Sequence, residues 1–252
     1  TPPEGLILVA GARDSGRTTT AAALAALANH PMRQVVLLSR DGIAAVPGAL
    51  SVAVPRPTDL PAILGDVLAQ NPDVVIIDGV DPGEPARAVV RAAMDGALIV
   101  ATVQGSRAFD AIERLVGGGV PAWQLAATLQ AVIGQRLLRS VHEACSAAHE
   151  PSPAELEEMR FPREAVEKAK FRAARGCGKC YGTGYLGRVV AAEALFPSAA
   201  FRQALALGEP SDRLLAIARD DGFQTLWEDA VGKLALGRTT LDELRAVLFA
   251  RD

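Results

Sequence analysis

The sequence predicts an α/β protein whose core is a parallel sheet covered by helices on both faces, in three αβα layers. Two observations support this prediction. Short, continuous apolar runs, typical of strands buried on both faces, recur from Gly5 to about Leu138. Segments with helical periodicity separate these runs, and such an alternation of strands and helices is typical of a doubly wound sheet.

The first part of the chain contains the expected elements in alternating order. We expect strands at residues 6–9, 34–39, 73–78 and 97–102. We expect a helix that begins near Thr18 and ends before Pro31, and further helices at residues 58–69, 84–94, 107–116 and 120–138. Pro31 ends the first helix because proline has no N–H group to donate within a helix.

After residue 138 the pattern changes. Residues 150–170 are charged and have helical periodicity, whereas residues 176–187 are rich in glycine and contain two cysteines. A short strand at 189–194 precedes several short amphipathic helices in 198–252. We therefore predict three domains: the α/β core at 1–138, a metal-binding segment at 139–190 and a helical subdomain at 191–252.

The composition excludes several classes of protein. Among the 252 residues no apolar run is long enough to span a membrane, and we expect no signal peptide. The net charge of −3 does not favour nucleic acid as a partner. Three cysteines do not suggest a set of disulfides, so a Cys-x-x-Cys pair indicates metal binding or redox chemistry.

A phosphate-binding loop follows the first strand. Gly11 and Gly16 have the spacing of the G-x-x-x-x-G-K-[ST] motif, and Thr18 follows them. Backbone N–H groups at such a loop bind phosphates, and the hydroxyl group of Thr18 can bind Mg²⁺. We therefore expect ATP or ADP with Mg²⁺ to bind at Gly11, Ser15, Gly16, Arg17, Thr18 and Thr19. The alternative is a tight turn that binds nothing.

The chain resembles the ATPases of bacterial type II secretion and type IV pilus assembly. The resemblance extends over nearly all 252 residues and corresponds to the C-terminal catalytic half of that family. The segments that carry it occur in the family's order: GLILVAG, NPDVVII, GALIVATVQGSRA, RLVGGGVPAWQLAATLQAVIGQRLLR, GCGKCYGTGYLGR and TLWEDAVGKLALGRTTLDELRAVL. It implies a RecA-like P-loop NTPase core with a zinc-knuckle insertion and a small helical C-terminal subdomain.

Four catalytic segments of the family differ in this chain. Arg17 replaces the lysine of the phosphate-binding loop, and Asp14 stands where the family usually has glycine. Residues 39–44 lack an essential glutamate. Gly79 replaces the glutamate that prepares the attacking water, and Gln104 replaces a histidine. Because phosphoryl transfer depends on positioning and electrostatic stabilisation, these losses together predict weak or no ATP hydrolysis.

Asp78 ends the apolar run at 74–77, in the manner of an acidic residue that holds Mg²⁺ through water. It would act together with Thr18. Alternatively, Asp78 caps the helix that follows Gly79, and the sequence leaves both interpretations open.

Two pairs of residues predict a zinc site. Cys177 and Cys180 form a Cys-x-x-Cys pair. The resembled family commonly has a second such pair after a segment that aligns with residues 136–139, and His142 and Cys145 occupy its positions here. Three thiolates and one imidazole suit tetrahedral Zn²⁺. The alternatives are a redox pair and a small apolar cluster of cysteines.

Three functions are compatible with these observations. The first is a degenerate ATPase domain that serves as a structural or regulatory subunit of a secretion or pilus-like system. The second is an active hexameric motor that uses Arg17 and Asp78 in unusual roles, and the third is a domain that senses nucleotide without turnover. The resemblance implies homo- or hetero-oligomers with paralogous ATPase subunits. It also implies a cytoplasmic location at the inner membrane, through membrane-embedded platform proteins.

Overall fold

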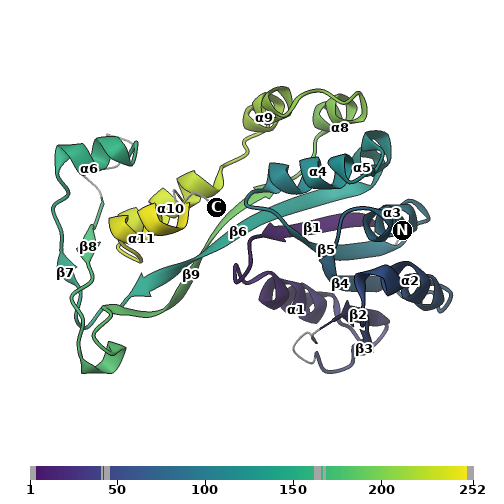
Figure 1. The fold of residues 1–252 in the computed structure, drawn as a ribbon, viewed down its shortest axis with the longest axis horizontal. Helices are drawn as coiled ribbons and strands as arrows, with labels where there is room; N and C mark the ends of the chain where they lie inside the picture. Colours follow the sequence, from purple (N-terminus) through teal and green to yellow (C-terminus); the bar gives the residue numbers. More distant parts are fainter. Residues whose placement is uncertain (1–3, 41, 43–45, 162–165, 167–168, 249–252) are drawn as a thin grey trace. The chain divides into compact units, whose positions relative to one another are not determined.

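The computed structural model describes residues 4–40, 42, 46–161, 166 and 169–248 (Figure 1). The chain divides into two compact units, which we describe separately. Unit 1 comprises Thr1–Gln135 and Glu193–Phe223, and unit 2 comprises Arg136–Ala192 and Gln224–Asp252. No described helix is long and apolar enough to cross a membrane. The predicted division into three domains stays a prediction.

The strands form one largely parallel sheet in the order β3-β2-β4-β5-β1-β6-β9. Their bounds are Gly5–Gly11 for β1, Val35–Ser39 for β2, Leu50–Ala53 for β3, Val74–Val80 for β4, Leu98–Gln104 for β5, Leu129–Val141 for β6 and Tyr185–Leu195 for β9. β1 pairs in parallel with β5 and β6, and β4 pairs in parallel with β2 and β5. The predicted parallel sheet is therefore confirmed.

Helices cover both faces of the sheet in unit 1. These helices are α1 (Arg17–Ala28), α2 (Leu60–Leu68), α3 (Glu84–Met94), α4 (Ala108–Gly117), α5 (Ala122–Thr128), α8 (Ala199–Ala206) and α9 (Ser211–Asp220). Successive residues of a strand point to opposite faces. In β1, Leu8 accordingly belongs to the cluster that contains α2 to α5, whereas Val9 belongs to the cluster that contains α1. Burial on both faces explains why the strands are continuous apolar runs.

The predicted helix at 120–138 is wrong in its second half. Helix α5 ends at Thr128, whose hydroxyl group donates a hydrogen bond to the carbonyl oxygen of Gln124 at 2.9 Å. The following residues form β6, in which Val132 lies opposite Leu8 of β1. Both elements are apolar and largely buried, and periodicity alone does not separate a buried helix from a buried strand. The β-branched pair Val132-Ile133 favours the strand.

The structure differs from the sequence predictions at two further places, β3 and the charged segment 150–170. β3 was not predicted, because this short edge strand is mostly exposed and lacks a continuous apolar run. Within the charged segment 150–170, the structure contains a short helix, α6 (Pro153–Glu158), which begins with a capping box at Ser152. Residues 162–165 and 167–168 of that predicted helix lie outside the described residues.

Unit 2 has its own apolar core. It contains the antiparallel pair β7 (Ala147–Ala148) and β8 (Arg172–Ala173), the short helix η2 (Gly178–Cys180), and the helices α10 (Leu226–Ala235) and α11 (Leu241–Leu248). Phe161 and Phe171 pack together with a ring-centroid distance of 5.2 Å, and Leu234 and Leu244 are fully buried. The helices predicted from the amphipathic pattern of residues 198–252 are thus present as α8 to α11.

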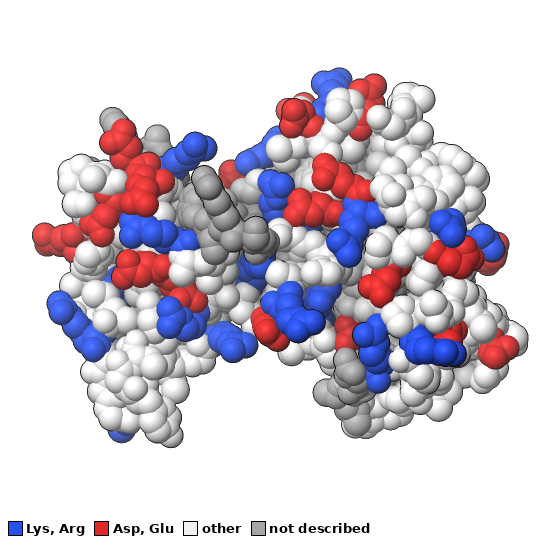
Figure 2. Space-filling model, in the orientation of Figure 1, with Lys and Arg blue, Asp and Glu red and all other residues white. Residues whose placement is uncertain are grey.

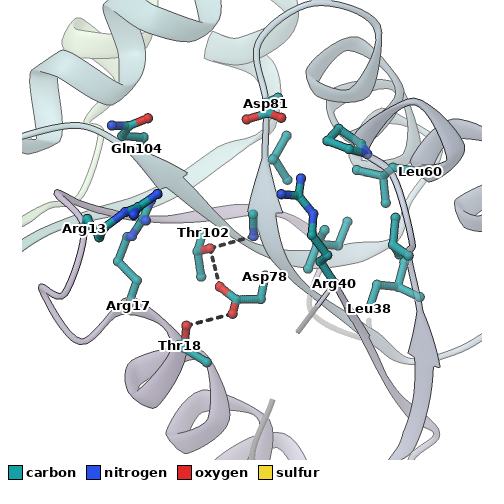
Figure 3. A pocket seen from close by; sticks show the side chains of 15 residues that line it. Arg13, Arg17, Thr18, Leu38, Arg40, Leu60, Asp78, Asp81, Thr102 and Gln104 are labelled. Carbon is teal, nitrogen blue, oxygen red and sulfur yellow. Dashed lines mark hydrogen bonds between the residues drawn. The ribbon is translucent and has the colours of Figure 1, made fainter. Parts of the chain in front are cut away.

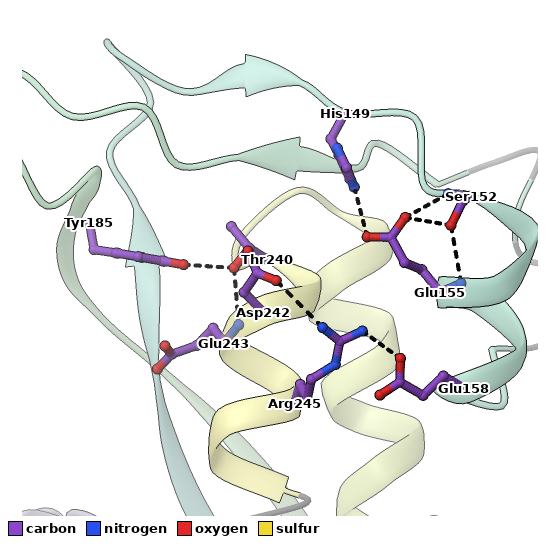
Figure 4. A network of polar contacts seen from close by, with 9 residues as sticks. All are labelled: His149, Ser152, Glu155, Glu158, Tyr185, Thr240, Asp242, Glu243 and Arg245. Carbon is purple, nitrogen blue, oxygen red and sulfur yellow. Dashed lines mark hydrogen bonds and ion pairs between the residues drawn. The ribbon is translucent and has the colours of Figure 1, made fainter.

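Polar contacts in unit 2 join Tyr185 to Thr240 and Thr240 to the backbone N–H of Glu243 (Figure 4). Glu243 is almost fully buried and accepts hydrogen bonds from the backbone N–H of Arg139 at 2.8 Å and from its Nε at 2.6 Å. The hydrogen bond to Glu243 raises the pKa of Arg139. The guanidinium group of Arg139 also lies 4.1 Å from the ring centre of Tyr185, whose hydroxyl group is 2.7 Å from that of Thr240.

Removal of the buried acid should destabilise this network. We expect Glu243→Ala to lower the free energy of unfolding by about 2 kcal/mol, because the substitution leaves the N–H and guanidinium groups of Arg139 without their acceptor. Glu158→Ala is the control in the same unit, since Glu158 is an exposed partner of Arg245 and such pairs contribute about 0–1 kcal/mol. Urea unfolding measures both values. Equal effects of the two substitutions would contradict the assigned role of Glu243.

Charged side chains of both signs are interspersed on the face shown in Figure 2. Ion pairs along a helix include Arg87 with Glu84 and Lys233 with Asp229. Such exposed pairs contribute little to stability.

Candidate nucleotide pocket and metal site

The loop between β1 and α1 makes two close turns. Gly16, the N-cap of α1, has φ 87°, and Asp14 has φ 59°. A side chain at Gly11 would place its Cβ only 2.0 Å from Oγ of Ser15, so this position requires glycine. Oγ of Ser15 is buried and has no hydrogen-bond partner among the described residues. The loop therefore brings its backbone close to the N-terminus of α1, as a phosphate-binding loop must.

Asp78 is held by two threonines at the carboxyl end of β4 (Figure 3). Thr18 donates a hydrogen bond to its Oδ2 at 2.7 Å, and Thr102 donates one to its Oδ1 at 2.6 Å. The N-cap of the following helix, α3, is Gly83, so the interpretation of Asp78 as a helix cap is wrong. Because Thr18 gives its hydrogen to Asp78, the lone pairs of its oxygen remain for a cation. This pair fits Mg²⁺, a hard cation that prefers oxygen ligands.

A bulge in β4 fixes the position next to Asp78. The pairing of β4 with β5 shifts between Ile77 and Val80, so Asp78 and Gly79 together face Thr102. The N–H group of Gly79 donates to the hydroxyl oxygen of Thr102 at 2.8 Å, and Gly79 has φ 93°. A β-bulge of this kind frequently redirects side chains beside a functional site. Here it places a residue without a side chain, Gly79, directly after Asp78.

A pocket of about 340 Å³ lies at the carboxyl ends of the strands in unit 1 (Figure 3). In a parallel α/β sheet, this edge is the usual place for a ligand. The residues that line the pocket are Arg13, Arg17, Thr18, Leu38, Arg40, Val54, Pro57, Leu60, Ile77, Asp78, Gly79, Val80, Asp81, Thr102 and Gln104.

Three arginines give the pocket a local positive charge, although the whole chain is negative. Burial lowers the pKa of Arg17, and the nearby charge of Asp78 partly offsets this effect. Arg13 and Arg40 are exposed. No hydrogen bond or ion pair joins the side chain of any of the three to another described residue. Unpaired guanidinium groups in a pocket indicate an anionic ligand.

The structure brings several predicted site residues together and leaves others apart. Arg17, Thr18, Asp78, Gly79 and Gln104 all line the pocket. The loop residues Gly11, Ser15, Gly16 and Thr19 do not line it, and neither does Asp14, which is exposed.

Thr102 and Gln135 were missed by the sequence analysis. Gln135 is buried in the middle of β6, where its Nε2 donates to the carbonyl oxygen of Ser15 at 2.8 Å and its Oε1 accepts from Thr20 at 2.8 Å. The side chain of Gln135 thus ties the loop to α1. A polar residue that ends an apolar run is a weak signal in the sequence. Gln135 reaches the loop only because β6 pairs with β1, where Gln135 lies opposite Gly11.

The four predicted metal ligands lie together in unit 2. The ligand atoms of His142, Cys145, Cys177 and Cys180 all lie within 4.8 Å of one another. His142 follows β6 and its N–H donates to the carbonyl oxygen of Gly184 at 2.9 Å, which brings the two halves of the cluster together. The three cysteines are free, so no disulfide competes for them.

The distances in the cluster suit a tetrahedral metal ion. The sulfurs of Cys145 and Cys177 each lie 3.8 Å from that of Cys180. Two sulfurs bound to zinc at about 2.3 Å in tetrahedral geometry are separated by about 3.8 Å. Nδ1 of His142 lies 3.2 Å from the sulfur of Cys145 and 3.4 Å from that of Cys177. The donor set therefore fits Zn²⁺, with Nδ1 as the ligand atom of His142.

Hydrogen bonds favour the thiolate form of one ligand. Burial raises the pKa of Cys180, but hydrogen bonds from the N–H groups of Cys177 and Gly184 and from the other thiols outweigh it and lower the pKa to about 6. Burial raises the pKa of Cys145. Since zinc binds thiolates, Cys180 is the cysteine best prepared for the metal.

Comparisons with known proteins agree with this architecture. A family model described as "Type II/IV secretion system protein" matches residues 1–246. The type IV pilus assembly ATPase PilB of Thermus thermophilus is 30% identical over 246 residues, which cover 97% of this chain and 28% of that protein. The type II secretion system protein E of Xanthomonas campestris pv. campestris is 28% identical over 251 residues, which cover 97% of this chain and 44% of that protein. The chain spans less than half the length of these two relatives.

Solved structures show the same fold. The ATPase DotB of Legionella pneumophila superimposes with a TM-score of 0.68 at 17% identity, over 100% of this chain and 62% of that chain. The pilus retraction motor PilT with bound ADP gives a TM-score of 0.67 at 21% identity, over 97% of this chain and 61% of that chain. With its P-loop, its parallel sheet and a family match over almost its whole length, the chain belongs to the family of type II/IV secretion system proteins.

Proposed function

We propose that this chain is a degenerate assembly-ATPase domain of a type II secretion or type IV pilus-like system. It binds ATP or ADP with Mg²⁺ and hydrolyses ATP weakly or not at all. In this role it serves as a structural or regulatory subunit. The chain's own P-loop provides the backbone N–H groups, and Thr18 and Asp78 provide the oxygen atoms that face the cation.

The observation that carries this proposal is the set of acids in the pocket. Among the described residues that line it, the acids are Asp78 and Asp81, and none of these residues is a glutamate. Both carboxylate oxygens of Asp78 accept hydrogen bonds, one from Thr18 and one from Thr102, and we assign this carboxylate to the binding of Mg²⁺. Gly79, at the position of the water-activating glutamate, offers no base, and general-base catalysis contributes about 10²–10⁴-fold.

One observation favours an active motor as the second candidate. The hydrogen bond between Thr18 and Asp78 places two oxygen atoms where Mg²⁺ would bind, and ATP hydrolysis requires such a cation. In that case Arg17 and Asp78 act in unusual roles. Nucleotide binding and hydrolysis, measured on the full-length protein with Mg²⁺, separate the candidates. Turnover identifies the motor, and binding without turnover identifies a regulatory or nucleotide-sensing domain.

We propose a structural role for the cluster of His142, Cys145, Cys177 and Cys180, with one bound Zn²⁺. Bound zinc would link the segment after β6 to the turn at η2. Because structural zinc contributes to the free energy of folding, it would stabilise unit 2 in particular. A redox pair and an apolar cysteine cluster are less well supported, since the ligand atoms of the imidazole and the three sulfurs all lie within 4.8 Å of one another.

We also propose that the protein assembles with itself or with an active paralogous subunit. Such assemblies would dock on platform proteins at the cytoplasmic face of the inner membrane. The relatives named above are assembly and secretion proteins, which supports this proposal.

Sedimentation tests the assembly directly. We expect the full-length protein to sediment as an oligomer, alone or mixed with an active paralogue, because the resemblance to secretion and pilus-assembly ATPases implies an oligomeric assembly. A protein that stays monomeric in both conditions would contradict the proposed role as a subunit.

A further inference from the structure

The arginines of the pocket differ from several arginines elsewhere in the chain. Arg56, Arg87 and Arg107 each form an ion pair with a carboxylate three residues away. Arg40 has no partner among the described residues, although Asp78 and Asp81 line the same pocket. Asp78 instead accepts its hydrogen bonds from two threonines. The guanidinium group of Arg40 is therefore available to a ligand.

Arg40 lies on the side of Asp78 that faces away from the loop. In Figure 3, Arg13 and Arg17 come from the loop and lie on one side of Asp78, whereas Arg40 comes from the end of β2 and lies on the other side. β2 neighbours β4 in the sheet, and Ser39 lies opposite Asp78 in the parallel register. Arg40 is thus one residue beyond the strand position that faces the cation-binding acid.

The direction of a bound phosphate chain follows from this arrangement. In P-loop proteins the backbone N–H groups of the loop surround the α- and β-phosphates, and the metal ion bridges the β- and γ-phosphates. The metal is held by the residues equivalent to Thr18 and Asp78, so the terminal phosphate lies beyond the loop, near these two residues. The next positive charge in that direction is Arg40. A diphosphate, which lacks the terminal group, would not reach it.

We propose that Arg40 binds the terminal phosphate of a nucleoside triphosphate, so that the pocket prefers a triphosphate to a diphosphate. This inference rests on the nucleotide binding proposed above. A guanidinium group binds phosphate oxygens in a bidentate manner, which gives both affinity and orientation. Arg40 stands in the segment where the family's essential glutamate is missing, and its positive charge favours retention of the triphosphate. The pocket would then report which nucleotide is present.

The test compares two arginines at the two ends of β2. Arg40 lies at its carboxyl end, beside the pocket, and Arg33 lies before its amino end, away from the pocket. Both are exposed, so neither substitution should prevent folding. The affinities of full-length wild type, Arg40→Gln and Arg33→Gln are measured by calorimetry with Mg²⁺. The two probes are ADP and the triphosphate analogue whose β–γ bridging oxygen is replaced by an imido group.

We expect Arg40→Gln to weaken binding of the triphosphate analogue about tenfold or more, because a hydrogen-bonded ion pair is lost. Binding of ADP should change by less than about threefold, and Arg33→Gln should change neither affinity, since a single distant charge is screened. Equal losses for both probes, or no loss in Arg40→Gln, would overturn the proposal while leaving nucleotide binding intact. If the wild type binds neither probe, the nucleotide site itself is refuted and this inference with it.

Discussion

Phosphate release should rise appreciably only in a variant that combines Arg17→Lys with Gly79→Glu. Arg17→Lys alone should improve nucleotide binding, because lysine is a compact charge that fits beside the phosphates. It should leave turnover near background, since no residue then orients the attacking water. The glutamate restores such a group, and we expect an increase of about 10²-fold or more in steady-state phosphate release. When several residues act as one catalytic unit, the return of one of them alone does not restore the rate.

The conformation of Gly79 determines how this experiment must be controlled. Gly79 has φ 93°, a conformation that residues with a side chain rarely adopt, so any substitution there is strained. The strain costs about 1–3 kcal/mol. A Cβ at this position would meet no other atom within 4 Å, so there is room for the side chain. The matched control is Arg17→Lys with Gly79→Ala, which carries the same strain without the carboxylate. Equal rates in the two double variants would show that glutamate at 79 is not sufficient.

Cys177→Ser should remove the metal and strongly destabilise unit 2. Metal analysis of the wild type should give about one Zn²⁺ per chain, because four ligands form a single closed site. Since zinc binding contributes to folding, we expect the melting temperature to fall by about 10 °C or more in the variant. Chelation of the wild type should produce a similar fall.

Lys179→Ala is the control for this experiment. Lys179 is exposed and lies between Cys177 and Cys180, but it offers no ligand to the cluster. The variant should retain zinc and melt like the wild type. A wild-type protein that contains no metal, or whose melting temperature does not change on chelation, would contradict the zinc site.

The strands of the core could be predicted because burial on both faces leaves a clear mark in the sequence. The runs at β1, β4 and β5 are continuous and apolar, and flanking helices separate them. β6 could not be identified in the same way, since it follows α5 without a turn. Its strand conformation depends on pairing with β1. Gly134 of this strand allows the close approach of Glu193 and Ala108. A Cβ there would lie 2.7 Å from Glu193 and 2.8 Å from the backbone nitrogen of Ala108.

The candidate sites could be predicted where a short motif holds their residues together. The loop residues and the two pairs of metal ligands belong to such motifs. Arg40 and Thr102 could not be assigned to the pocket, because the sheet order β2-β4-β5 brings them together from distant parts of the chain. The bulge at Gly79 could not be predicted from the sequence either, since it depends on the register between β4 and β5.

The central claim is that this domain binds nucleotide but does not hydrolyse it at the rate of a motor. Steady-state phosphate release by the full-length wild-type protein, with saturating ATP and Mg²⁺, tests it most directly. We predict a rate indistinguishable from that of a Thr18→Ala variant, which loses the hydroxyl group that faces Asp78. A wild-type rate of about one per second or more, in the range typical of enzymes, would contradict the account and identify the protein as an active motor.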